Sequence, residues 1–205
     1  AQEDEDRTVD VPVDFAAWQE RNPDIYAWIE YPGTNVDYPI VQSAKDDAYY
    51  LRRDIDGKEA VAGSLYTEHT YNSKTFDDPV TVIYGHNMAN RTMFGGLQSH
   101  IEAADLASTE EYFYVYLPGR ILTYRVVGGA PGDDAHILYY NDFSDPTGFS
   151  NYFGNLYAQS GGHVNLPGLL RPSPNDRVVI LATCMNGEKY LRYLIIGVLT
   201  DDTAD

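Results

Sequence analysis

Cysteine is almost absent from this chain, because Cys184 is the only one among 205 residues. A single cysteine excludes an internal disulfide and a structural zinc site built on cysteines. It fits either a reducing compartment or an exported protein that keeps a reactive thiol. The five histidines show no His-Glu-x-x-His spacing, so we expect neither a catalytic metal nor any other cofactor.

Basic residues are also scarce, since 14 Lys and Arg stand against 31 Asp and Glu, for a net charge of −17. This charge opposes binding to phosphate backbones and to anionic membrane surfaces, so no nucleic-acid partner is expected. No apolar run approaches the ~20 residues that a membrane-spanning helix needs. We therefore expect membrane association only through an N-terminal anchor outside this sequence.

The length predicts one compact domain that buries about 70% of its unfolded surface. Residues 1–13 are acidic and without periodicity, which predicts a flexible lead-in or stem, and residues 14–205 form the single domain. Asp14 is placed to cap a helix from Phe15 to Glu20. Asn22-Pro23 repeats this start and predicts a second helical turn that carries Ile25 and Trp28.

From residue 31 onward, apolar runs and turn residues predict a mainly β fold. Expected strands, including a hairpin around Pro118-Gly119, cover residues 36–41, 63–66, 80–84, 112–117, 121–127, 177–184 and 193–199. Helical segments are expected at 48–51, 93–97 and 101–106. The long connection from 128 to 175, with a helix at 148–157, predicts a lid or a substrate wall.

Reactive side chains lie at the ends of three apolar strands. Cys184 ends the strand 177–184, Arg192 opens the next one after an Asn186-Gly187 turn signal, and His86 follows the strand 80–84. The turn predicts that Cys184 and Arg192 lie on neighbouring antiparallel strands. Imidazolium and guanidinium groups both lower a cysteine pKa from about 8.5, so this set can supply a thiolate, an acid and an anion stabiliser.

Each of these residues also has a structural interpretation. A lone cysteine at a strand end is most often an inert buried group. Arg192 alone could be a solvated charge, and Arg177 is its nearby rival. The other histidines lie in polar contexts and are expected to be solvated, namely His69, His100, His136 and His163. The 18 tyrosines are expected to pack in and around the barrel.

The ordered motifs TVIYGHNM, MFGGL, ILATC and RYLIIGVL resemble those of the sortases, and class B is the most similar class. The resemblance covers about residues 14–200. It implies a sortase-type eight-stranded β-barrel with N-terminal helices and a helix in the long loop before the cysteine strand. It also implies that Cys184 is the nucleophile, His86 the acid/base and Arg192 the oxyanion stabiliser. The groove for the signal peptide is expected to include Leu51, Tyr84, Thr183, Leu138 and Tyr139.

The same resemblance implies a cysteine transpeptidase at the extracellular face of the cell membrane. It would cleave an NPxTG-like sorting signal after Thr through a thioester and pass the protein to an amine of the cell wall. A lysine of a pilin is the alternative acceptor. The strand before the cysteine departs from the family pattern at Ile180 and Ala182, so the adjacent pocket is expected to differ. Carboxylates around the groove are a candidate attractor for a cationic amine.

Other functions fit less well. Papain-like and NlpC-like hydrolases carry the cysteine before the histidine, whereas His86 precedes Cys184 here. An L,D-transpeptidase would carry a Ser-x-Gly-Cys-type motif, which is absent. A non-enzymatic acidic surface adhesin remains the alternative outside enzymology, and it leaves the three reactive strand ends unexplained.

Overall fold

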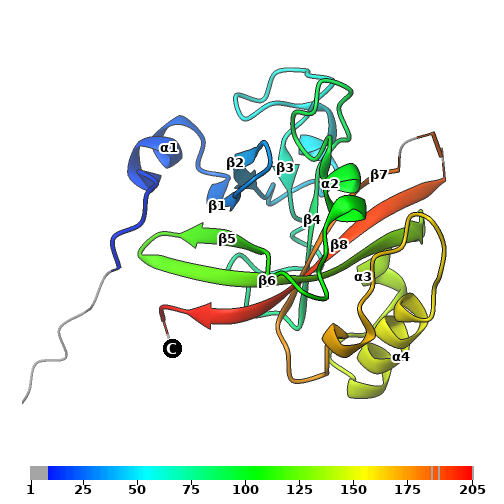
Figure 1. Ribbon diagram of the computed structural model, residues 1–205. Helices are drawn as coiled ribbons and strands as arrows, with labels where there is room; N and C mark the ends of the chain where they lie inside the picture. Colours follow the sequence, from blue (N-terminus) through cyan, green and yellow to red (C-terminus); the bar gives the residue numbers. More distant parts are fainter. Residues whose placement is uncertain (1–8, 186, 189, 205) are drawn as a thin grey trace, which may run out of the picture.

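The computed structural model describes residues 9–185, 187–188 and 190–204 (Figure 1). Its strands close into a barrel in the order β1-β2-β3-β4-β7-β8-β6-β5. The strands are β1 (Ile25–Tyr31), β2 (Val36–Val41), β3 (Leu65–Tyr66), β4 (Val80–Tyr84), β5 (Tyr112–Leu117), β6 (Arg120–Asp133), β7 (Val178–Cys184) and β8 (Leu191–Asp202). The expected mainly β, eight-stranded barrel is confirmed.

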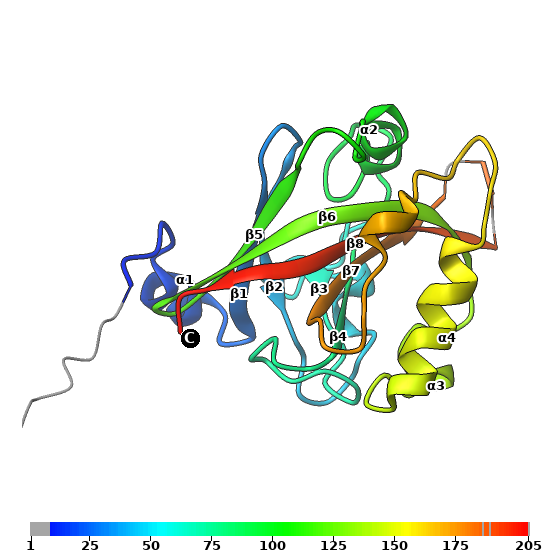
Figure 2. The same ribbon diagram turned by 60° about the horizontal axis from the view of Figure 1, so that its bottom comes forward.

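Short helices flank the strands of the barrel. They are α1 (Phe15–Arg21), α2 (Leu97–Ala103), α3 (Ile137–Tyr140) and α4 (Pro146–Tyr157), with 3-10 turns η1 (Tyr49–Arg52) and η2 (Gly168–Leu170). The helices α3 and α4 lie beside one end of the long β6–β8 pair, and α1 lies toward the other end (Figures 1 and 2). No described helix is long and apolar enough to cross a membrane.

Strand β7 is buried on both faces. Val179 and Leu181 belong to the cluster of apolar side chains inside the barrel. Ile180 and Ala182 alternate with them and pack into a second cluster that includes the α4 residues Phe149, Phe153 and Leu156. Because successive side chains of a strand point to opposite faces, a strand covered on both sides needs a continuous apolar sequence. The run before Cys184 is therefore a structural requirement of its place in the fold.

The long connection is partly regular structure. Strand β6 continues to Asp133, where the glycine-rich composition had predicted a loop from residue 128. A Cβ added at Gly129 would lie 2.4 Å from Ile101 Cγ2, and one at Gly132 would lie 2.7 Å from Leu194 Cδ1. These glycines are thus needed for close packing within a strand. Helix α4 confirms the helix expected at 148–157, and Asp145 caps it through the N–H groups of Thr147 and Gly148.

Two expectations for helices are wrong. The predicted second helical turn after Asn22 is the strand β1, in which Ile25, Ala27 and Ile29 are fully buried. Asn22 instead ends α1, with its N–H donated to Trp18 O. The two helices expected within 93–106 are a single helix, α2, preceded by Gly96 at φ 93°. Residues 1–8 of the predicted lead-in and Asn186 of the predicted turn lie outside the described residues. The division at residue 14 stays a prediction.

An ion-pair cluster ties the ends of three strands at the rim far from Cys184. Asp202 at the end of β8 lies 2.6 Å from Arg120 and 2.8 Å from Arg177, and its side chain is 1% exposed. Both arginines also lie 2.9 Å from Asp77. The hydrogen bond from Arg120 is the main cause that lowers the pKa of Asp202 to about 2. The contacts between the ends of β6, β7 and β8 therefore depend on the ionised state of Asp202.

This cluster predicts acid sensitivity. Because the pKa of Asp202 in the fold lies below its unfolded value of about 3.9, its stabilisation is present above about pH 4 and is lost as the pH falls toward 2. The contribution at neutral pH is roughly 2 kcal/mol, or about 4–8 °C in Tm for a chain of this size. Thermal unfolding of Asp202→Asn should show the lower Tm at pH 7 and a shallower loss of stability in acid. An unchanged acid dependence in the variant would contradict this assignment.

Candidate active site

Cys184 and Arg192 are direct partners across the antiparallel pair β7 and β8. Side chains that are directly opposite on such a pair lie on the same face, with Cβ atoms about 4.5–5.5 Å apart. Cys184 is exposed and forms no disulfide, and both residues line one cavity. The expected antiparallel placement is confirmed, and the thiol and the guanidinium are held together by backbone pairing.

His86 follows β4, which runs parallel to β7 on its other side. Tyr84 pairs with Ala182, and Gly85 N–H donates to Ala182 O at 3.1 Å, so His86 comes level with Cys184 two residues later. The ring Nε2 lies 2.6 Å from Leu51 O. Since a carbonyl oxygen only accepts, Nε2 carries a proton in this arrangement, and the proton that His86 gains or loses sits on Nδ1.

Asn87 is a site residue that sequence reasoning missed. Its Nδ2 donates to the backbone oxygen of Cys184 at 2.8 Å. This bond ties the segment that carries His86 to the end of β7, and so fixes the imidazole relative to the nucleophile. The only sequence signal was its position directly after His86.

The three residues share a cavity of about 250 Å³. Its lining combines them with apolar, aromatic and acidic side chains and consists of Leu51, Tyr66, Glu68, Tyr84, Gly85, His86, Asp133, Asp134, Ala135, His136, Ile137, Ala182, Thr183, Cys184 and Arg192. The segment 133–137, which links β6 to α3, forms one wall. A cavity with an exposed thiol, an imidazole and a guanidinium can accept an acyl group from an extended peptide.

Phenol and carboxyl groups of the cavity have shifted pKa values. Burial, together with the nearby Glu68, raises the pKa of Tyr66 and of Tyr84, so both phenols stay protonated at neutral pH. The two rings stack with centroids 5.3 Å apart. Burial also raises the pKa of Glu68, while His136 acts in the opposite direction. The phenols can therefore donate hydrogen bonds but do not serve as bases.

The other four histidines were expected to be solvated, and their side chains are 31–56% exposed. Of these four, His136 is the one that faces the active site. It lines the cavity, and its Nε2 lies 2.8 Å from Glu68 Oε2. Each of the remaining three also contacts a carboxylate: His69 with Asp47 at 2.6 Å, His100 with Glu111 at 2.9 Å and His163 with Glu102 at 2.7 Å. In an acidic chain, a histidine near the surface readily finds a carboxylate partner.

The residues predicted to bind the signal peptide divide into two groups. Leu51, Tyr84 and Thr183 line the cavity. Leu138 and Tyr139 lie on α3 outside its lining, where Leu138 packs against the cluster around α4 and Tyr139 is 66% exposed. The binding role of all five stays a prediction. Within the described residues, no three or more His, Cys, Asp or Glu side chains are placed to hold a metal ion.

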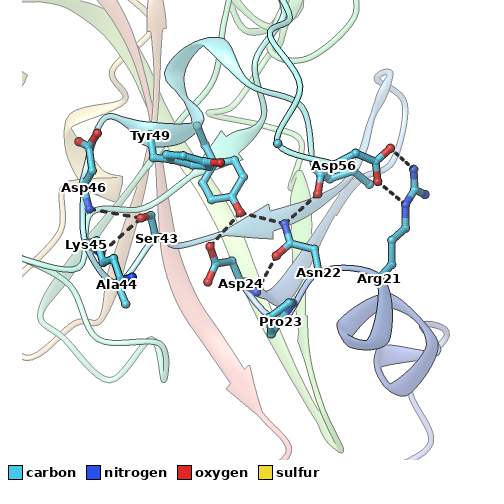
Figure 3. A pocket seen from close by; sticks show the side chains of 13 residues that line it. Arg21, Asn22, Pro23, Asp24, Ser43, Ala44, Lys45, Asp46, Tyr49 and Asp56 are labelled. Carbon is cyan, nitrogen blue, oxygen red and sulfur yellow. Dashed lines mark hydrogen bonds and ion pairs between the residues drawn. The ribbon is translucent and has the colours of Figure 1, made fainter.

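A larger hollow of about 490 Å³ lies between the end of α1 and the loops around η1 (Figure 3). Its polar groups bond to one another: Asn22 Nδ2 donates to Tyr50 OH and to Ile55 O at 2.8 Å, and Tyr50 OH donates to Asp24 at 2.8 Å. None of its lining residues belongs to the Cys184 cavity. This network braces η1, the turn whose Leu51 carbonyl holds His86.

Comparisons with known proteins agree with this geometry. Sortase B of Listeria monocytogenes is 31% identical over 174 residues, which covers 84% of this chain and 67% of that protein. The chain belongs to the class B sortases. A mutant form of Clostridium perfringens sortase B has the same fold, with a TM-score of 0.76 and 25% identity over 91% of this chain and 86% of that chain. A Staphylococcus aureus sortase B–substrate complex also shares the fold, with a TM-score of 0.75 and 20% identity over 91% of this chain and 84% of that chain. No family model matches the chain.

The resemblance inferred from the motifs is thus confirmed, and the enzyme is a cysteine transpeptidase of the sortase type. A sortase needs its cysteine exposed in a groove, which the single thiol of this barrel satisfies. The adhesin alternative has no support in these findings.

The two candidate arginines are separated by the fold, and this leads to a prediction. Arg192 pairs with Cys184, whereas Arg177 is bound to Asp77 and Asp202 at the other end of β7. Arg192→Ala should lower kcat by about 10²–10³, because a fixed donor to the developing oxyanion is lost. Arg192→Lys should recover only part of the loss, since a point charge does not reproduce the planar fork. Arg177→Ala should lower Tm and leave kcat nearly unchanged. Steady-state kinetics on a cleavable peptide would reveal an exchange of these phenotypes, which would contradict the assignment.

Proposed function

We propose that this sortase cleaves an NPxTG-like sorting signal after Thr and transfers the acyl group to an amine. The observation that supports this most strongly is the convergence of Cys184, His86 and Arg192 on one cavity from three adjacent strands. A relative from Staphylococcus aureus with the same fold has been solved as a substrate complex, which supports substrate binding by this fold.

In the proposed reaction, the Cys184 thiolate attacks the carbonyl carbon of the Thr residue in the signal. The Arg192 guanidinium stabilises the negative oxygen of the tetrahedral intermediate. Collapse of the intermediate breaks the peptide bond, and protonated His86 gives its proton to the departing amine. A thioester to Cys184 remains. An incoming amine then attacks the thioester, His86 takes a proton from it, and the thiolate leaves.

The proposed donor-binding residues are Leu51, Tyr84 and Thr183 in the cavity and Leu138 and Tyr139 on the adjoining helix α3. Glu68, Asp133 and Asp134 add negative charge to the same cavity. Such a surface attracts an ammonium group, and the attraction is screened over about 8 Å at physiological ionic strength. An amine of the cell wall is our proposed acceptor. With such an acceptor, we propose that the enzyme lies at the extracellular face of the membrane. It would be held there by a segment N-terminal to the catalytic domain 14–205.

The proposal predicts the behaviour of two single variants and their combination. Cys184→Ala should remain folded by circular dichroism and lose both cleavage and transfer, because alanine forms no thioester. His86→Ala should also lose most activity. The double variant should be no worse than Cys184→Ala, since residues that act as one unit are not additive. Mass spectrometry of the products formed from an NPxTG-like peptide and an amine is the measurement.

The acceptor can be assigned in the same assay. Peptidoglycan cross-bridge amines and lysine peptides should be offered in parallel, and the preferred class is the one ligated at the lower concentration. Substantial turnover by folded Cys184→Ala would reject the mechanism. Transfer rates that do not respond to salt would reject the role of the acidic groups.

A further inference from the structure

The pair Glu68 and His136 is a contact of the cavity that takes no part in the bond-making and bond-breaking steps proposed above. Glu68 lies two residues after β3, and its side chain is 13% exposed. His136 lies between β6 and α3. In the barrel, β4, β7 and β8 separate β3 from β6, and these are the strands that bring His86, Cys184 and Arg192 to the site. Four inter-strand steps of about 4.8 Å span about 19 Å along the sheet. A 2.8 Å contact between the two residues therefore bridges the catalytic strand ends.

The orientation of His136 is set by its own backbone. As the N-cap residue of α3, it accepts the N–H of Tyr139 on Nδ1 at 3.1 Å. A nitrogen that accepts cannot carry the proton, so the proton lies on Nε2, which faces Glu68 Oε2. The approach is off the hydrogen-bond axis, since Oε2 is buried and has no well-aligned donor. The contact is therefore mainly the attraction of a polar N–H to a buried carboxylate.

Aromatic rings enclose this pair. The ring of Tyr71, from the loop after β3, lies 4.6 Å from the His136 ring, and Tyr84 lies 6.5 Å from it. Glu68 is largely buried, and burial strengthens an electrostatic contact and raises the cost of breaking it. The β6 end of the segment 133–137 is held independently, because Gly132 pairs with Arg192. The wall of the cavity is thus fixed at one end by backbone pairing and at the other by the pair together with the buried side chain of Ile137.

We infer that Glu68 and His136 act as positioning residues that hold the wall 133–137 across the cavity and thereby set the affinity for the sorting-signal peptide. This inference rests on the proposed function. The pair has no role in the proposed bond-making and bond-breaking steps, so its loss should change peptide binding more than the chemical step. Loss of the pair should raise KM, whereas loss of Arg192 should lower kcat.

Three variants test the contact. Because Glu68 also interacts with the Tyr84 phenol, His136→Asn is the variant that removes the contact alone. His136→Asn keeps a good N-cap for α3 but is too short to reach Glu68. Glu68→Leu removes the acceptor at similar size, and Glu68→Gln restores an acceptor oxygen without the charge. His163→Asn is the matched control, because His163 makes a similar contact to Glu102 outside the cavity.

Steady-state hydrolysis of a sorting-signal peptide, the alkylation rate of Cys184 by iodoacetamide and Tm should be measured for each protein. His136→Asn and Glu68→Leu should each raise KM by about tenfold, because the wall loses one buried polar contact, with kcat within about twofold. The double variant should be no worse than either single one. Glu68→Gln should recover part of the loss, and the control should match the wild type. Alkylation should be unchanged throughout.

Unchanged KM in both His136→Asn and Glu68→Leu would overturn the inference, as would losses that multiply in the double variant. A fall in kcat without a rise in KM would also overturn it, because the pair would then act on the chemistry. If Glu68→Leu does not fold, the KM and kcat values of His136→Asn and Glu68→Gln test the inference by the same criteria. A wild-type enzyme without turnover on any sorting-signal peptide would overturn the proposed function itself and this inference with it.

Discussion

The register of β7 between β4 and β8 is the constraint on which the site depends. Parallel pairing with β4 brings the segment after Tyr84 level with Cys184, and antiparallel pairing with β8 sets Arg192 opposite Cys184. A slip of one residue in a strand would move every side chain to the other face. Such a slip would also move Cys184 to a buried position, because Thr183 and Met185 on either side of it are buried. The core that stabilises the barrel is thus the same feature that aligns the reactive groups.

Strand pairing places some residues of the groove, and side-chain contacts place the others. The nucleophile and the arginine are placed by strand pairing, and His86 is fixed by Asn87 and by the carbonyl of Leu51. The wall from β6 to α3 has no such ladder beyond Asp133. Side chains hold it instead, through the contact of His136 with Glu68 and the buried packing of Ile137. Sequence changes in the wall can therefore alter peptide affinity while the reactive groups keep their positions.

Local patterns in the sequence predicted much of this fold. The apolar run before Cys184, the hairpin around Pro118-Gly119 and the cap at Asp14 are local signals, and each is confirmed. The strand β1 was mistaken for a helix because Asn22-Pro23 looks like a helix start, although Ile25, Ala27 and Ile29 alternate with the period of a strand. The end of β6 was missed because its glycines resemble a loop, whereas they serve close packing.

The site was predictable to the extent that it lies at strand ends. The motifs identified the Cys, His and Arg positions, which the fold brings together in one cavity. Glu68 and His136 could not be paired from the sequence, since 67 residues separate them and neither stands in a motif. Their contact depends on the closure of the barrel, which places the exits of β3 and β6 at the same rim. Asn87 was missed because its partner is a backbone oxygen. Every residue has such an oxygen, so the sequence gives no sign of the contact.

The proposed reaction depends on an acyl-enzyme in which Cys184 carries part of the peptide it cleaves. Wild-type enzyme mixed with an NPxTG-like peptide should be quenched in acid during turnover and examined by intact-protein mass spectrometry. We predict a mass increase equal to that of the peptide fragment that ends at Thr minus one water, located on Cys184 by digestion and removed by hydroxylamine. Rapid cleavage of the peptide with no acyl group on Cys184, or with the group on another residue, would contradict it.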